Sequence, residues 1–251
     1  PVTRAYIDQV RGVDSAYTVS ALAERGLIED CGRLDVPGRP ILYKTGDAFL
    51  RTLGISSLDE LPELPDTSSE EGADRLIRAL EDSGYEVTYM PNHVAALRFP
   101  FSVEELARYE AVILSDIGSN TLLLHPDTFA KSQKTPNRCQ VIRDYVFAGG
   151  ALLMVGGYMA FSGIDAKAKY GRTPLSEVLP VTCLETDDLM ERPEGVTPQA
   201  LLPQHPALSG VPADWPHFLG YNRTLPKEGA QVVMTIAGDP FIAFGDYGKG
   251  R

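Results

Sequence analysis

The sequence predicts an α/β protein, in which a small winged-helix module is followed by a doubly wound, mostly parallel sheet domain of flavodoxin-like type. Three observations lead to this prediction. The first 65 residues show short helices and strands in winged-helix order, the later residues alternate helices with apolar strands, and an acidic, Pro-rich stretch from Leu61 to Glu71 separates the two patterns. The expected domains are residues 1–65 and residues 66–251, with the sheet domain truncated at both ends.

The elements of the first module follow from its capping residues and its apolar spacing. Thr3 suits the N-cap of a first helix, Asp14 or Ser15 suits that of a second, and Gly26 provides the stop of the second helix. A wing of two short strands and a last helix complete the unit. The expected elements are helices over residues 3–10 and 15–25, strands over 27–32 and 41–43, and a helix around 49–53.

Short phrases in this module are more specific than its pattern of elements. They are Thr3-Arg4-Ala5, Arg11-Gly12-Val13, Glu24-Arg25-Gly26-Leu27-Ile28, Gly38-Arg39-Pro40-Ile41-Leu42-Tyr43 and Leu58-Asp59-Glu60-Leu61-Pro62. Together and in this order, they resemble the second winged helix of segregation and condensation protein B (ScpB). The resemblance implies that residues 1–65 bind the kleisin ScpA in a bacterial SMC condensin complex, and that the module grips a protein rather than DNA.

The charge balance agrees with a protein partner. The chain has a net charge of −11, and residues 1–65 hold seven Lys and Arg against ten Asp and Glu. Direct nucleic-acid binding is therefore not expected, although Arg33 and Arg39 in the wing leave a contact with phosphates open. No apolar run is long enough for a membrane span, and three widely spaced cysteines suit a reducing cytoplasm, so the expected location is cytoplasmic.

Residues 66–251 alternate helices with apolar strands. The continuous apolar run over residues 111–115 is typical of a buried parallel strand, and a similar run follows over 151–155. Such an alternation predicts a sheet with helices on both faces, whose ligand sites lie beyond the carboxyl ends of the strands. The other expected elements are helices over residues 68–82, 103–108 and 137–147 and a strand over residues 86–90.

This second module also contains phrases that are specific to a family. Among them are Glu71-Gly72-Ala73-Asp74, Val87-Thr88-Tyr89-Met90-Pro91, Ser115-Asp116-Ile117-Gly118-Ser119-Asn120 and Phe218-Leu219-Gly220-Tyr221-Asn222. They resemble a family of cytoplasmic proteins with a glutamine-amidotransferase-like fold. The resemblance covers essentially all of residues 66–251, and it implies a class I amidotransferase fold more firmly than an activity.

The chain offers no cysteine where such an enzyme needs one. A class I amidotransferase places a cysteine at the sharp turn after a strand, with a histidine to take its proton and a carboxylate to orient the imidazole. The corresponding turn here is Val155-Gly156-Gly157-Tyr158-Met159. Cys139 falls within a predicted helix and Cys183 on a predicted strand. Glutaminase activity by the usual mechanism is therefore not expected, and the catalytic residues stay unknown.

Polar residues gather where the two apolar strands end. The candidate ligand-binding residues are Asp116, Ser119, Asn120, Gly156, Gly157 and Tyr158. Because the carboxyl ends of parallel strands meet at one edge of a sheet, these residues are expected to converge on a small polar ligand. The two glycines either present backbone N–H groups to an anion or a carbonyl oxygen, or only permit a close turn, and the sequence favours neither.

No metal and no cofactor are expected. His205, His217, Asp187, Asp188 and Glu191 match no ligand spacing and are interpreted as solvated loop residues. The first hypothesis of function is chromosome segregation and condensation through ScpA. The alternative is small-molecule binding, or a cysteine-independent hydrolase or transferase activity, of the α/β domain, with the ScpB-like part a fusion or assembly artefact. A homo-oligomer is compatible with both.

Overall fold

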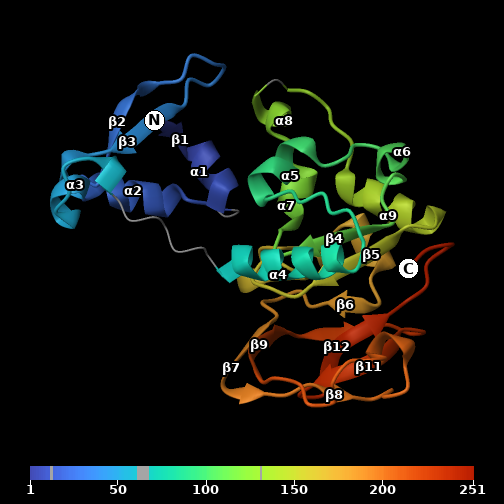
Figure 1. Ribbon diagram of the computed structural model, residues 1–251. Coiled ribbons are helices and arrows are strands. Elements are labelled where there is room, and N and C mark those ends of the chain that lie inside the picture. The colour runs from blue at the N-terminus through green and yellow to red at the C-terminus, as the bar shows by residue number, and fades with distance from the viewer. Residues whose placement is uncertain (12–13, 61–67, 131) are drawn as a thin grey trace. The chain divides into compact units, whose positions relative to one another are not determined.

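A computed structural model describes residues 1–11, 14–60, 68–130 and 132–251 (Figure 1). The chain forms two compact units, of which one comprises residues 1–97 with 126–133 and the other residues 98–125 with 134–251. The expected domain boundary at residues 65–66 and most of the expected linker fall within residues 61–67, outside the described residues. None of the described helices has the length and apolarity to cross a bilayer.

The first unit begins with the predicted winged helix, and its elements are confirmed. The strands form one antiparallel sheet in the order β1-β3-β2. The elements are β1 (Val2–Thr3), α1 (Arg4–Arg11), α2 (Ala16–Glu24), β2 (Ile28–Arg33), β3 (Ile41–Thr45) and α3 (Asp47–Leu53). A short 3₁₀ helix, η1 (Leu58–Glu60), follows.

The predicted helix caps of this module are present. The backbone N–H of Tyr6 donates to Thr3 Oγ1 at 3.2 Å, which caps α1. For α2, the side chain of Asp14 rather than that of the N-cap residue Ser15 accepts a bond, from Ala16 N at 2.7 Å. Gly26 follows α2 with a φ of +67°, a conformation that glycine adopts without strain.

The regular elements in the remainder of the first unit are helices. It contains α4 (Ser68–Asp82), most of α5 (Asn92–Arg98) and α8 (Pro126–Ala130). The strand expected over residues 86–90 is wrong, because these residues belong to no strand of the structure. A strand requires a hydrogen-bonded neighbour, and none of the described strands forms a ladder with this segment.

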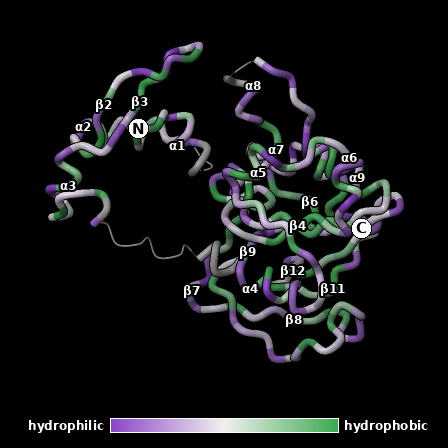
Figure 2. Tube along the Cα trace, turned by 45° about the horizontal axis from the view of Figure 1, so that its top comes forward, coloured by the Kyte–Doolittle hydropathy of each residue, from purple (hydrophilic) through white to green (hydrophobic). Residues whose placement is uncertain are grey.

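The second unit contains the two predicted apolar strands as a parallel pair. β4 (Ala111–Ser115) and β5 (Ala151–Val155) run in register from Ala111 beside Ala151 to Ser115 beside Val155. Val112 and Leu114 of β4 are buried, and Figure 2 shows this apolar stretch in the interior of the unit. Three helices accompany the pair, namely α6 (Val103–Leu106), α7 (Ser119–Leu123) and α9 (Arg138–Ala148).

The other sheets of the second unit are antiparallel. Their strands are β6 (Val181–Cys183) with β10 (Thr224–Pro226), β7 (Leu189–Val196) with β9 (Phe218–Asn222), and β11 (Gln231–Ile236) with β12 (Asp239–Phe244) and β8 (Gln199–Ala200). The α/β class is therefore confirmed, while the parallel part of the described structure is confined to β4 and β5. The antiparallel strands β6 and β7 lack the continuous apolar run that is typical of buried parallel strands, so the pattern that predicted β4 and β5 did not extend to them.

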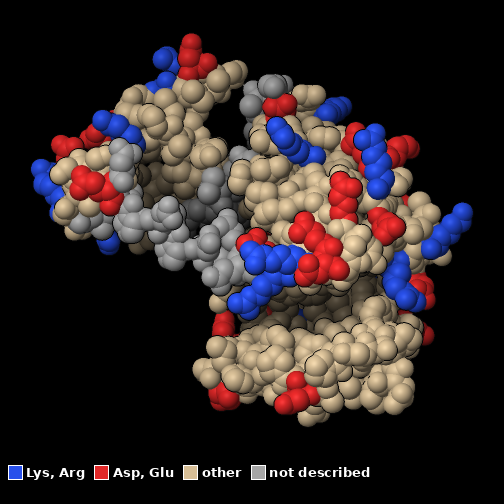
Figure 3. Space-filling view, viewed as in Figure 1, with Lys and Arg blue, Asp and Glu red and all other residues tan. Residues whose placement is uncertain are grey.

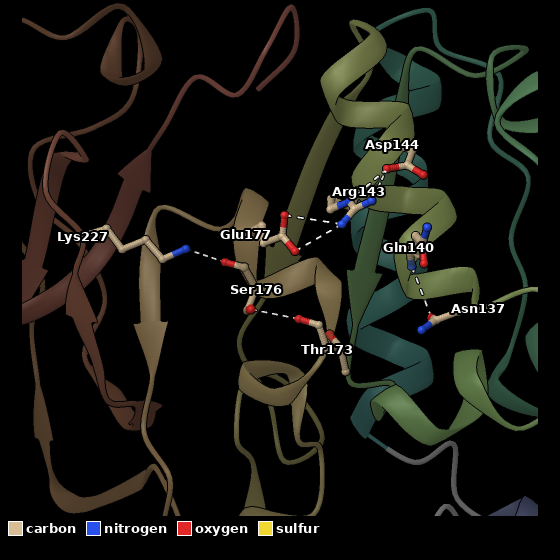
Figure 4. A network of polar contacts seen from close by, with 8 residues as sticks. All are labelled: Asn137, Gln140, Arg143, Asp144, Thr173, Ser176, Glu177 and Lys227. Atoms are coloured by element: carbon tan, nitrogen blue, oxygen red, sulfur yellow. Dashed lines mark hydrogen bonds and ion pairs between the residues drawn. The ribbon is translucent and has the colours of Figure 1, made fainter.

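Helix α9 is joined by an ion pair to the segment that precedes β6. Asn137 caps the helix by accepting from Gln140 N at 3.2 Å and Gly149 ends it, so the helix expected over residues 137–147 is confirmed. On its outer side, Arg143 binds Asp144 at 2.7 Å and Glu177 at 3.2 Å (Figure 4). Glu177 lies in η4 (Pro174–Val178), so this ion pair joins α9 to the segment that leads into β6.

Candidate functional site

The structure brings together the two loops that the sequence singled out. β4 and β5 end side by side, and Asp116 follows β4 directly. Its carboxylate oxygen Oδ1 accepts a hydrogen bond from the backbone N–H of Met159, in the loop after β5, at 2.6 Å. A Cβ atom added to Gly157 would lie 2.8 Å from the same oxygen, closer than real side chains approach. The two loops are therefore in direct contact.

Asn222, at the end of β9, holds Gly157 by both of its backbone groups. The N–H of Gly157 donates to Asn222 Oδ1 at 2.8 Å, and Asn222 Nδ2 donates to the carbonyl of Gly157 at 3.1 Å. A Cβ atom on Gly156 would lie 2.9 Å from Asn222 Oδ1. Of the two roles that the sequence left open for these glycines, the structure favours the close turn, because both lie where a side chain would collide with a neighbour.

A hydrogen bond to the buried Asp188 orients the side chain of Asn222. Its carboxylate accepts from Asn222 Nδ2 at 2.8 Å, from Ser162 N at 2.8 Å and from Gly163 N at 3.0 Å. The residue is only 1% exposed, and burial raises the pKa of its carboxyl group despite these bonds. The interpretation of Asp188 as a solvated loop residue is therefore wrong, because neutral donors replace water around it.

Sequence reasoning missed Asp188 and Asn222 as structural partners of the site. Asp188 is 72 residues beyond Asp116 in the numbering, and Asn222 lies in a different sheet from β4 and β5. The sequence contains one weak signal, which is that Asn222 is a polar residue at the end of the apolar strand β9. Nothing in the spacing relates it to Gly157.

The loop after β5 has an unusual backbone. Phe161, Asp165, Ala166 and Lys169 have φ between +51° and +59°, and Asp116 has φ of +50° in the facing loop. Such residues lie in a sparsely populated conformation that persists only where the surroundings impose it. Besides Asp188, the restraints include the Tyr170 hydroxyl, which donates to Ile117 O at 2.5 Å, and Ser119 N, which donates to Ala168 O at 3.0 Å.

The six candidate ligand-binding residues differ in exposure. Asp116 and Gly157 are half-buried and in contact, and Gly156 is exposed beside them. Tyr158 is 57% exposed, and Asn120 is also exposed. Ser119 is fully buried, and no described residue forms a hydrogen bond with its Oγ. The loops thus present Asp116, Asn120 and Tyr158 with Ser119 beneath the surface.

The two cysteines of this unit lie on regular elements and not within the two loops themselves. Cys139 lies in α9 and Cys183 in β6, as predicted, and both are buried. Burial raises the pKa of each thiol to about 11, which leaves both protonated near neutral pH. Cys31 is exposed in β2 of the winged helix, where its Sγ donates to Leu42 O at 3.3 Å.

His205 and Asp187, in the later loops, make contacts with different parts of the chain and not with each other. His205 Nε2 lies 3.1 Å from Gln231 Oε1, and its ring stacks on Phe244. Asp187 is exposed and accepts from Asp165 N at 2.7 Å and from Leu189 N at 2.9 Å. The part of the chain that the structure describes contains no group of three or more His, Cys, Asp or Glu arranged to hold a metal ion.

We predict that Asn222→Ala destabilises the protein by roughly 2–4 kcal/mol, because it removes the bonds to Gly157 and takes one donor from a buried carboxylate. Urea-induced unfolding measures the change. Asn120→Ala is the matched control, since Asn120 is exposed and its replacement is expected to cost less than about 0.5 kcal/mol. Equal effects of the two substitutions would show that Asn222 does not brace the loops.

Two families of known proteins match different parts of the chain. Residues 55–251 match the family described as "Putative glutamine amidotransferase", and residues 1–64 match the family described as "Segregation and condensation complex subunit ScpB". The two matches overlap over residues 55–64.

Curated relatives match the N-terminal segment. Segregation and condensation protein B of Clostridium acetobutylicum is 50% identical over 70 residues, which make up 28% of this chain and 35% of that protein. The protein of the same name from Agathobacter rectalis is 52% identical over 71 residues, or 28% of this chain and 38% of that protein. The chain therefore spans little more than a third of the length of these relatives.

Two solved structures resemble a larger part. Cytoplasmic Protein STM3548 from Salmonella typhimurium has a TM-score of 0.69 and 47% sequence identity, and the match covers 71% of this chain and 72% of that one. Cytoplasmic Protein STM1381 from Salmonella typhimurium LT2 has a TM-score of 0.68 and 46% identity with the same coverage. From the family match over residues 55–251 and these solved relatives, we conclude that the chain belongs to the glutamine amidotransferase-like family and carries an N-terminal segment homologous to ScpB.

Proposed function

We propose that residues 1–65 form a separate domain that acts in chromosome segregation and condensation by binding the kleisin ScpA of an SMC complex. The match of residues 1–64 to the ScpB family carries this proposal.

The two solved relatives of the second domain are described as cytoplasmic proteins, and we propose the same compartment for this protein.

The surface of the winged helix is compatible with a protein partner. Tyr17 of α2 is 86% exposed, and Tyr6 of α1 is 51% exposed. Exposed aromatic side chains are frequent anchors of protein interfaces. The face of this module in Figure 3 carries acidic and basic side chains side by side rather than a continuous basic stripe, which DNA binding would favour.

We predict that the full chain binds a C-terminal segment of ScpA and that Tyr17→Ala weakens this binding at least about tenfold, because it removes the most exposed aromatic group of the module. Isothermal titration calorimetry measures both affinities. Tyr85→Ala is the matched control, since Tyr85 is 54% exposed but lies outside residues 1–64. The proposal fails if ScpA does not bind while duplex DNA binds with micromolar, salt-dependent affinity.

We further propose that the α/β domain binds a small polar ligand between the loops that follow β4 and β5, and that it does so without a cysteine nucleophile. The contact between Asp116 and the Gly157–Met159 turn carries this proposal, because it gathers polar groups at the carboxyl edge of the parallel pair. The turn where an amidotransferase would hold its thiolate has Gly156, Gly157 and Tyr158 instead.

We predict that the purified chain releases no ammonia from glutamine. The described thiols of the α/β domain are buried and protonated at neutral pH, so neither can attack an amide. A coupled assay of ammonia release tests this, with Cys31→Ala as the control for the exposed thiol. Turnover that disappears in Cys139→Ala or Cys183→Ala would show that one of these residues is the nucleophile.

Alkylation provides an independent control for the state of these thiols. A thiol with a pKa of about 11 forms the reactive thiolate only as the pH approaches 11. In the folded protein between pH 7 and pH 8, iodoacetamide should therefore modify Cys31 alone, as detected by mass spectrometry of the digested chain. Rapid modification of Cys139 or Cys183 in this range would contradict the assignment.

A further inference from the structure

We propose that the site between the β4 and β5 loops accepts a small ligand that donates hydrogen bonds, through an ammonium group or several hydroxyl groups, and that it does not accept anions. This inference rests on the proposed function of the α/β domain and specifies its ligand class. It follows from which polar groups of the two loops are already engaged and which remain open.

Two backbone donors of the turn after β5 are engaged. Gly157 N donates to Asn222 Oδ1 and Met159 N donates to Asp116 Oδ1. Farther along the loop, Ser162 N and Gly163 N both donate to Asp188. Binding of an oxyanion requires neighbouring N–H groups that converge on open space. Here internal acceptors already hold these groups at 2.6–3.0 Å.

The loop after β4 is no better suited to an anion. Ser119 N, in the first turn of α7, donates to Ala168 O at 3.0 Å, and Thr121 N donates to Gly118 O at 3.1 Å. In addition, α7 has only five residues, so its dipole adds little. A ligand that needs these backbone donors would have to break internal bonds, so the open donors of the two loops are the neutral side chains of Asn120 and Tyr158.

Acceptors, in contrast, remain open. Asp116 uses Oδ1 for Met159, and among the described residues neither a hydrogen bond nor an ion pair engages its other oxygen. The Ser119 hydroxyl, which can donate as well as accept, is fully buried without a hydrogen-bond partner in the described structure. Lys167, in the facing loop, is paired with Asp165 at 2.8 Å. The site therefore offers a carboxylate whose negative charge calls for a donor on the ligand.

The backbone of Asp116 supports a ligand role for this side chain. Its φ of +50° is a conformation that a non-glycine residue adopts only under restraint, and aspartate tolerates it better than most residues. The bond from Met159 N fixes one carboxylate oxygen and thereby orients the other. A preoriented acceptor lowers the entropic cost of binding a small ligand.

The test is a titration of the ¹⁵N-labelled full chain, followed by two-dimensional NMR of the amides of residues 116–120 and 156–159. The probes are methylammonium chloride, glycerol and sodium phosphate, each against sodium chloride of matched ionic strength. We expect saturable shifts with methylammonium, with glycerol or with both, and none with phosphate. Shifts with methylammonium alone assign an ammonium ligand, and shifts with glycerol alone assign a hydroxylated one.

The substitution Asp116→Asn tests the role of the negative charge while it preserves the contact between the loops. The amide keeps an oxygen that can accept from Met159 N, so the loops should stay in place while the affinity for the active probe falls at least tenfold. Saturable binding of phosphate at these amides would overturn the inference and leave the proposed ligand site standing. The absence of shifts with all three probes would overturn the proposed site and the inference with it. An unchanged affinity in Asp116→Asn would remove Asp116 from the recognition.

Discussion

The buried carboxylate of Asp188 is the constraint on which the candidate site depends. A carboxylate that is 1% exposed is costly unless donors surround it, and Ser162, Gly163 and Asn222 supply them. The same bonds tie the strained loop after β5 to the end of β9. Asn222 in turn holds Gly157 by two hydrogen bonds, so the end of β9, which lies outside the parallel pair, helps to position the turn after β5.

The contacts of Gly156 and Gly157 bear on our proposal that the α/β domain lacks the cysteine nucleophile of a glutamine amidotransferase. Gly156 and Gly157, after β5, lie so close to Asn222 and Asp116 that a side chain at either position would collide with them. The N–H groups of Gly157 and Met159 donate to internal acceptors, and the described thiols of the domain are buried in α9 and β6. These contacts hold the turn in place, and they are the basis of our proposal that the α/β domain binds a ligand without thiolate attack.

Local patterns predicted the elements that depend on local interactions. The cap at Thr3, the helix over residues 137–147, the apolar strands β4 and β5 and the adjacency of their loops follow from spacing and from the topology of parallel strands. The strand expected over residues 86–90 failed because strands need partners that spacing does not identify. Asp188 was misjudged for a related reason, since its donors lie about 25–35 residues away and only the folded chain brings them to it.

Amide hydrogen exchange of the full chain tests most directly whether Asp188 and Asn222 brace the turn. We expect the amides of Gly157, Ser162 and Gly163 to be protected to a similar degree and to become exposed together, because one buried pair of side chains holds all three. We also expect the three amides to lose protection together in Asn222→Ala. Exchange of Gly157 at the rate of an open loop, with Ser162 and Gly163 still protected, would show that Asp188 and Asn222 do not brace the turn.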